Sequence, residues 1–230
     1  MMTALVDHGA AERLAKEIAD RIRSLPNATT EPVRAVRREY SKRIAKSPPG
    51  FVLSLAVRLL DTAGVPRFTA YELVKHHRGA AASLDRKKLE LLGRGLNEWG
   101  DVDCFSCYLS GPAWREHQIP DDVVRRWARS RDRWWRRVAL VSTVALNSRA
   151  QGGTGDAGRT LDICRLLVSD RDDMVVKAMS WALRELSKRD PKSVRDFLDE
   201  HQGMIAARVV REVRNKLTTG LKTPKKRFAS

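Results

Sequence analysis

The sequence predicts an all-α fold built from short, paired helices. Apolar residues recur at three- and four-residue spacing along almost the whole chain, whereas sustained alternation of Val, Ile and aromatic residues is absent. Clusters of proline, glycine and small polar residues interrupt this spacing, and each cluster disfavours a continuing helix. The interruptions fall at Pro26-Asn27, Ser47–Gly50, Gly64–Pro66, Ser110–Pro112 and Gln151–Gly155.

These interruptions set the order of the expected helices. The first three helices end at the first three interruptions, the sixth ends at Ser110–Pro112, and the eighth ends before the glycine-rich segment. The remaining boundaries follow the apolar spacing. Twelve helices in six pairs are expected, over residues 10–25, 31–46, 51–62, 68–79, 83–98, 101–109, 121–128, 133–147, 156–168, 172–188, 191–200 and 204–217.

The later helices are weakly similar to one another. Residues 136–142 align with residues 176–182 at an offset of 40, and residues 207–211 align with 176–180 at an offset of 31. Repeats of this length with two helices per unit are typical of HEAT and armadillo proteins, in which neighbouring pairs stack into a curved surface. We therefore expect an α–α superhelix of HEAT-like repeats, forming a single domain over residues 1–217; an ordinary helical bundle remains an alternative.

The charge of the chain indicates a polyanionic partner. Its 230 residues carry 44 Lys and Arg against 28 Asp and Glu, a formal charge of +16, and 42% are hydrophobic, enough for a continuous core. The most apolar stretch, Phe51–Val57, is too short to cross a bilayer, and Asp7 and Glu12 do not fit a signal peptide. Three cysteines argue against a disulfide framework. These features predict a cytoplasmic monomer, associated with the nucleoid in a bacterium.

A basic tail is expected at the C-terminus. Residues 218–230 hold Lys222, Lys225, Lys226 and Arg227 and no acidic residue. We interpret this segment as a mobile tail.

The segment from Arg125 to Arg137 contains seven arginines and three tryptophans. Arginine offers paired donors to phosphate oxygens, and indole faces pack on sugars or bases. We interpret Trp127 and Trp134 as core residues and the arginines, taken together, as a phosphate-contacting face.

A carboxylate near this basic segment calls for an explanation. Trp99 and Asp103 are four residues apart, which places them on one face of a helix. A carboxylate repels phosphates, but it can stabilise an oxocarbenium-like sugar or orient water during cleavage of a glycosidic bond. The structural alternative is that Asp101 or Asp103 caps a short helix, and spacing alone favours this alternative.

Two other signals predict no site. Cys104 and Cys107 have the spacing of half a zinc site, but no second pair completes it. The glycine-rich segment Gly152–Gly155 lacks the Lys-Ser/Thr of a phosphate loop. We expect neither a metal nor a cofactor.

Three ordered segments carry a resemblance to a known family. They are Trp99–Asp103 (W-x-x-x-D), Trp134–Ala139 (W-x-R-R-x-A) and Lys177–Glu185 (K-A-x-x-W-x-L-R-E), the last followed by Asp190-Pro191. Together they resemble the DNA alkylation repair enzyme family, the AlkD-like alkylpurine DNA glycosylases built from HEAT-like repeats. The resemblance extends from Glu31 to Leu217.

This resemblance implies an activity and roles for individual residues. It implies excision of cationic N3- and N7-alkylated purines from double-stranded DNA without flipping the base, with Asp103, Trp99 and Trp181 as the catalytic residues. Arg137 matches an arginine that holds the DNA backbone beside the lesion. Its basic neighbours are expected to bind the same DNA: Arg136, Arg133, Lys177 and Arg184.

Two other functions stay open. One is a catalytically silent relative that recognises damaged or branched DNA. The other is a HEAT-like scaffold for an acidic protein partner. Both DNA-binding functions predict an affinity that falls steeply with salt.

Overall fold

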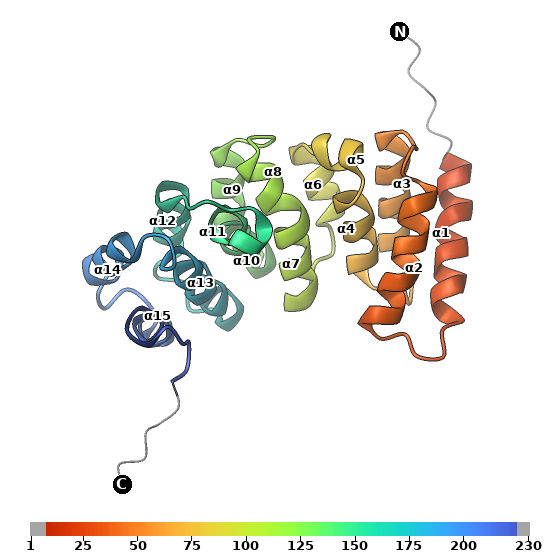
Figure 1. Cartoon of the computed structure of the whole chain (residues 1–230). Coiled ribbons are helices and arrows are strands. Elements are labelled where there is room, and N and C mark those ends of the chain that lie inside the picture. The colour runs from red at the N-terminus through yellow and green to blue at the C-terminus, as the bar shows by residue number, and fades with distance from the viewer. Residues whose placement is uncertain (1–7, 225–230) are drawn as a thin grey trace. The chain divides into compact units, whose positions relative to one another are not determined.

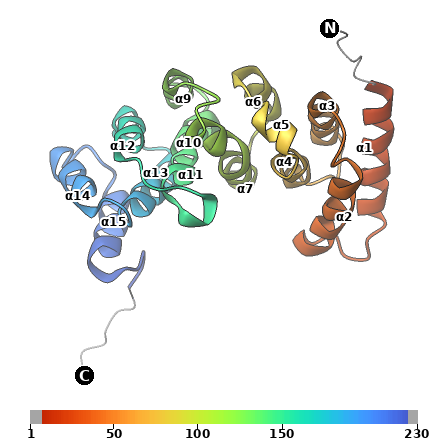
Figure 2. The same ribbon diagram turned by 45° about the horizontal axis from the view of Figure 1, so that its top comes forward.

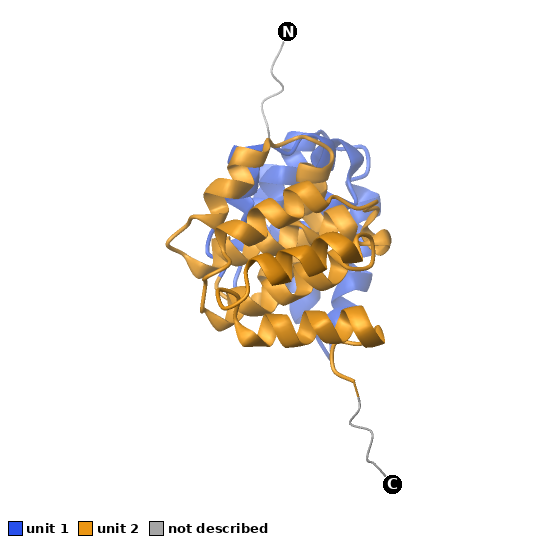
Figure 3. Cartoon of the chain, turned by 90° about the vertical axis from the view of Figure 1, so that its left-hand side faces the viewer, with its two compact units in different colours: residues 1–96 blue, residues 97–230 orange. Residues whose placement is uncertain are grey.

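The computed structural model describes residues 8–224, and every regular element in this range is helical (Figure 1). The predicted all-α class is therefore confirmed. Within the described range, no helix combines the length and apolar character that crossing a membrane requires. The chain divides into two compact units, residues 1–96 and 97–230 (Figure 3). The expectation of one domain over residues 1–217 stays a prediction.

Unit 1, residues 1–96, is a stack of paired helices. Its helices are α1 (His8–Arg23), α2 (Thr30–Arg43), α3 (Pro49–Leu60), α4 (Arg67–Lys75), α5 (Arg78–Ala82) and α6 (Arg86–Leu92). Helix α1 packs on α3 and α2 packs on α4, while α3 also contacts α4. Each helix thus buries its apolar face against neighbouring helices, as expected for stacked helical pairs.

The fifth predicted helix, over residues 83–98, is shorter than expected. Asp85 accepts a hydrogen bond from the Lys88 amide and so caps α6, which starts at Arg86. The helix ends at Leu92, and Gly95 adopts a left-handed φ of 68° two residues after the Gly93 cap. The fourth predicted helix also ends early, at Lys75, because the Nδ1 of His77 accepts from the Ala80 amide and starts α5.

Unit 2, residues 97–230, contains the remaining helices. They are α7 (Trp99–Phe105), a π-helical turn (Ser106–Ser110), α8 (Gly111–Arg115), α9 (Asp121–Ala128), α10 (Arg133–Ser142), α11 (Val144–Asn147), a 3₁₀ turn (Arg149–Gln151), α12 (Ala157–Leu166), α13 (Asp173–Leu186), α14 (Pro191–Glu200) and α15 (Ala207–Thr219). Helix α10 packs between α7 and α13, and α13 packs against α15 (Figure 2). Helices α9 and α12 contact each other and cover the other side of α10.

The predicted break at Ser110–Pro112 is wrong. The chain stays helical from Trp99 to Arg115, and the π-helical turn changes the hydrogen-bond register before Pro112. Pro112 has no amide hydrogen to donate, and it lies directly after this turn, at the start of α8. Gly111 serves close packing instead, because a Cβ there would lie 2.7 Å from the Cβ of Ala145 and 2.8 Å from the Ser142 carbonyl oxygen.

The expected basic tail over residues 218–230 stays a prediction. Helix α15 continues to Thr219, two residues into the predicted tail, and ends at Gly220, which has a left-handed φ of 73°. Lys225, Lys226 and Arg227 lie outside the described residues.

Candidate active site

Trp99 and Asp103 lie one turn apart on the short helix α7. The helix begins at Trp99 with Glu98 as its N-cap, so the interpretation of Asp101 or Asp103 as an N-cap is wrong. The Trp99 residue is 61% exposed, whereas the Asp103 side chain is only 19% exposed. Helix α7 therefore presents an open indole face one turn before a largely buried carboxylate.

Arg137 of α10 donates two parallel hydrogen bonds to that carboxylate. Its Nε donates to Oδ1 of Asp103 at 3.0 Å, and its Nη2 donates to Oδ2 at 2.9 Å. Its Nη1 donates to the carbonyl oxygen of Met174 on α13 at 2.6 Å. The buried guanidinium thus links three helices that pack side by side, α7, α10 and α13.

Burial and the ion pair act in opposite directions on Asp103. Removal from water disfavours the charged form and raises the pKa of this carboxyl, while the hydrogen bonds and charge of Arg137 lower it. Burial has the larger effect, so the pKa of Asp103 is raised above its ordinary value. The result is a carboxylate more basic than one on the surface.

Helix α13 supplies the third predicted segment. Lys177, Trp181 and Arg184 have i, i+4, i+7 spacing and share one face of this helix, and each side chain is half-buried. Lys177 forms an ion pair with Asp173 at 2.6 Å. Burial lowers the pKa of Arg184, whose Nε donates to the hydroxyl of Ser180.

A buried polar network lies behind this face. The hydroxyl of Ser180 donates to Glu212 of α15 at 2.6 Å, and Arg208 pairs with the same carboxylate at 3.1 Å. Lys222 lies 3.5 Å from it. This network ties α13 to α15 and so supports the helix that carries Trp181.

Acidic side chains neutralise more of the arginines in residues 125–137 than the sequence of this segment suggests. Five of its seven arginines form ion pairs with carboxylates in the described structure: Arg125 with Asp162, Arg126 with Asp122, Arg133 with Asp172, Arg136 with Asp170 and Arg137 with Asp103. The exposed Arg129 and Arg131 have no carboxylate partner among the described residues. Arg136 also donates to two backbone carbonyls, of Ser130 and Arg131, so it helps to shape the turn before α10.

The three tryptophans of this segment have different surroundings. Trp127 is buried, in agreement with its interpretation as a core residue. Trp135 packs against Trp127 at 5.3 Å and edge-on against Phe105 at 6.2 Å between ring centroids, which joins α9, α10 and α7. Trp134 is half-buried, with the guanidinium of Arg133 4.9 Å from its ring centroid, so it lies at the edge of the core.

Several residues around the site were not singled out from sequence. Asp170 and Asp172 pair with Arg136 and Arg133, and Asp172 also caps α13 by accepting from the Met174 and Val175 amides. The sequence did indicate acidic partners here, because residues 169–173 contain three aspartates directly before the Lys177 segment. Glu212 and the Met174 carbonyl carried no such signal.

The cysteines and acidic residues show no metal geometry. Among residues 8–224, no group of three His, Cys, Asp or Glu side chains is arranged to hold a metal ion. None of Cys104, Cys107 and Cys164 forms a disulfide among the described residues, and burial raises the pKa of Cys164 to about 12.

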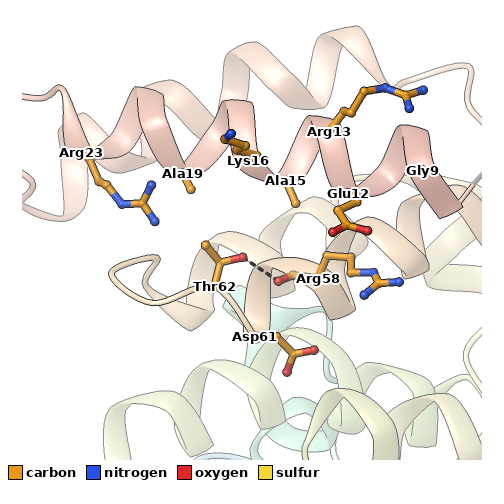
Figure 4. Close-up of a pocket in the computed structure, with 10 residues that line it drawn as sticks. All are labelled: Gly9, Glu12, Arg13, Ala15, Lys16, Ala19, Arg23, Arg58, Asp61 and Thr62. Atoms are coloured by element: carbon orange, nitrogen blue, oxygen red, sulfur yellow. Dashed lines mark hydrogen bonds between the residues drawn. The ribbon is translucent and has the colours of Figure 1, made fainter.

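Unit 1 has a solvent-open groove of its own. Its volume is about 610 Å³, and it lies between α1 and α3, with Ala15 and Ala19 at its base (Figure 4). Charges of both signs line it, including Glu12, Lys16 and Arg58. None of the predicted site residues lines this groove, since all of them belong to unit 2.

The chain matches a known protein family. A family model described as DNA alkylation repair enzyme matches residues 2–217, nearly the whole chain. None of the curated proteins matches the sequence.

Proposed function

Since the chain belongs to the DNA alkylation repair enzyme family, which supports a role in repair of alkylated DNA, we propose that it is a DNA glycosylase. Its substrates are cationic N3- and N7-alkylated purines in double-stranded DNA. The observation that carries the proposal is the largely buried Asp103 carboxylate, oriented by Arg137 and one turn from the exposed Trp99. The three segments of the resemblance begin at residues 99, 134 and 177 and lie on neighbouring helices of one unit.

The proposed reaction is hydrolysis of the N-glycosidic bond. As the bond between C1′ and the purine nitrogen breaks, its electron pair moves into the ring and neutralises the positive charge, so no general acid is needed. The water oxygen bonds to C1′ and releases its proton to Asp103 or to solvent. The products are an abasic site and the free alkylated base.

Asp103 contributes in two ways. Its negative charge stabilises the sugar cation that develops at C1′, an effect that is stronger beside a buried carboxylate than in water. Its raised pKa makes it a better proton acceptor for the attacking water. The two hydrogen bonds from Arg137 hold the carboxylate in one orientation.

Trp99 and Trp181 are proposed to face the cationic nucleoside. A cation–π contact between an indole ring and the cationic base is worth about 0.5–2 kcal/mol. Because Trp99 is 61% exposed, its ring is open to a large ligand and not enclosed in a pocket. This exposure supports excision with the base left in the duplex, in contrast to enzymes that extrude it.

Cationic side chains on α10 and α13 are proposed to bind the DNA backbone. Arg133 and Lys177 are the best placed, since their side chains are 52% and 38% exposed and their acidic partners are surface residues or helix caps. Arg136, Arg137 and Arg184 lie deeper and act on the DNA only if they exchange protein partners for phosphates. All of these residues come from one chain, so the proposed active form is a monomer. Its proposed location is the cytoplasm, on the nucleoid.

One observation favours a second candidate function. Both oxygens of Asp103 accept hydrogen bonds from Arg137 in this structure. A carboxylate held in this way can be purely structural, and the protein would then be a catalytically silent binder of damaged or branched DNA. Each oxygen keeps a second lone pair, however, so the ion pair leaves room for a water or a sugar.

The test is release of free base from duplex DNA. We expect the purified protein to release 7-methylguanine from a duplex that contains N7-methylguanine, well above spontaneous depurination. We expect no release of hypoxanthine from a matched duplex, because neutral hypoxanthine is a poor leaving group without a general acid. Tight, salt-sensitive binding to both duplexes without release from either would contradict the proposal and support the silent binder.

A further inference from the structure

A groove between α14 and α15 has an apolar base. Two cavities of about 660 and 250 Å³ adjoin there, and both are lined by Leu198 and Arg214. The larger also has Ile205 and Val210 in its lining, and the smaller has Leu217. The larger cavity is in the size range of ligand-binding clefts, and none of the predicted site residues lines either cavity.

The rim of this groove is strongly basic. Arg171, Arg195, Arg211 and Arg214 line it, and Asp199 is the one carboxylate among the lining residues. Asp199 lies 3.6 Å from Arg214, and Arg171 donates to the Met204 carbonyl. The exposed Arg195 and Arg211 have no carboxylate partner within residues 8–224.

We propose that this groove binds an acidic, amphipathic peptide segment of a partner protein. Leucine-like side chains of the segment would pack on the part-exposed Val210 and Leu217, above the buried Leu198 and Ile205. Its carboxylates would pair with the guanidinium groups, which bind carboxylates through two parallel hydrogen bonds. The apolar base favours a peptide over nucleic acid, because leucine side chains bury far more apolar surface there than the sugars of a backbone that lie between charged phosphates. The chain's own last residues are a poor occupant, since Lys225, Lys226 and Arg227 carry the same charge as the rim.

This inference is independent of the proposed glycosylase activity. It concerns different residues of unit 2 and predicts an interaction that needs no DNA. The protein would carry a docking surface for an acidic partner beside its DNA-binding residues.

The first test uses a synthetic probe with the full-length protein. The probe is a fluorescein-labelled peptide of about 16 residues, which spans roughly 24 Å as a helix, with Leu at i, i+4, i+7 and i+11 and Glu at most other positions. One control peptide has Gln in place of every Glu, and another has Ala in place of every Leu. By fluorescence anisotropy we expect each control to bind at least about tenfold more weakly, since both the charges and the apolar face contribute.

Variants then locate the site. The double variant Arg195→Glu, Arg211→Glu reverses two charges that have no partner to lose, and we expect it to bind the probe at least about tenfold more weakly. Val210→Asp in the base should weaken binding to a similar degree. The matched control is Arg149→Glu, because Arg149 is also exposed and has no carboxylate partner among the described residues. It should bind like the parent protein, and circular dichroism should show the same helicity for all variants.

Three outcomes would overturn the inference. Weakening by Arg149→Glu that equals the weakening by the double variant, per charge reversed, would show that the probe responds only to net charge. Complete competition by an unmodified duplex of about 20 base pairs, lost in the same variants, would identify the groove as a nucleic-acid surface. A shift from dimer to monomer in the groove variants by analytical ultracentrifugation would identify a second copy of the chain as its occupant.

Discussion

Replacement of Arg137 by Met should destabilise unit 2 strongly. The Arg137 side chain is 6% exposed and that of Asp103 is 19% exposed, so the change leaves a largely buried carboxylate without its partner. It also leaves the Met174 carbonyl without its donor. Removal of one member of a buried pair costs about 3–5 kcal/mol, and the remaining solvent contact of Asp103 points to the lower end, roughly 3 kcal/mol.

The assay is urea unfolding followed by tryptophan fluorescence. All six tryptophans lie in residues 97–230, so this signal reports on unit 2 alone. The control is Arg133→Met, one turn earlier on α10, where the ion pair with Asp172 is 3.5 Å long and the arginine is 52% exposed. We expect this control to cost no more than about 1 kcal/mol.

A double-mutant cycle completes this test. In Asp103→Asn, Arg137 keeps a neutral acceptor but loses its counter-charge, and the double variant should cost at least about 1.5 kcal/mol less than the two single changes together. Additive costs within about 0.5 kcal/mol, or equal costs for Arg137→Met and Arg133→Met, would refute the reasoning that Arg137 and Asp103 are coupled.

Four other predictions follow from the structure. Gly111→Ala should cost about 1–3 kcal/mol by urea unfolding, because its Cβ would overlap neighbouring atoms at 2.7–2.8 Å, whereas Gly158→Ala, with its nearest contact at 3.8 Å, should be neutral or stabilising. Burial raises the pKa of Glu212, but hydrogen bonds from Ser180 and Arg208 and the charge of Lys222 outweigh burial, so the pKa is lowered. The stabilisation from this carboxylate is therefore present above the ordinary Glu value of about 4.3 and is lost as pH falls through the lowered pKa. Glu212→Gln should destabilise the protein most at neutral pH and least in acid. Trp99→Ala should leave the free energy of unfolding within about 0.5 kcal/mol of the parent value, as expected for an exposed side chain, and should lower kcat/KM for base release about 2- to 30-fold. The rate of base release should fall with decreasing pH through a pKa above the ordinary Asp value of about 3.9, since Asp103 acts as a carboxylate; an unchanged rate across this range would argue against its role.

Much of the fold was predictable because it depends on local signals. The three- and four-residue apolar spacing predicted the all-α class, and Pro191 starts a helix in the structure at the predicted residue. The motif residues were also recognisable one segment at a time. What failed were boundaries at residues that make contacts between segments, such as Gly111, which packs too closely against Ala145 and Ser142 to carry a side chain.

The pairing of Asp103 with Arg137 could not be predicted from the sequence for the same reason. Asp103 and Arg137 were predicted to have separate roles, one in chemistry and one on the DNA backbone, and no local pattern shows that residues 34 positions apart share two hydrogen bonds. The acids Asp170 and Asp172 likewise neutralise arginines that are more than 30 positions away. The sequence therefore overstated how many arginines of the 125–137 segment are available to phosphates.

The most direct test of the central claim is the single-turnover rate of 7-methylguanine release by Asp103→Asn. The control is Asp122→Asn, which removes the same charge from a 64% exposed side chain. We predict that Asp103→Asn binds the lesion-containing duplex like the parent protein but releases the base at least about 100-fold more slowly, while Asp122→Asn releases it at the parent rate. Release by Asp103→Asn at the parent rate, with its fold intact, would contradict the account.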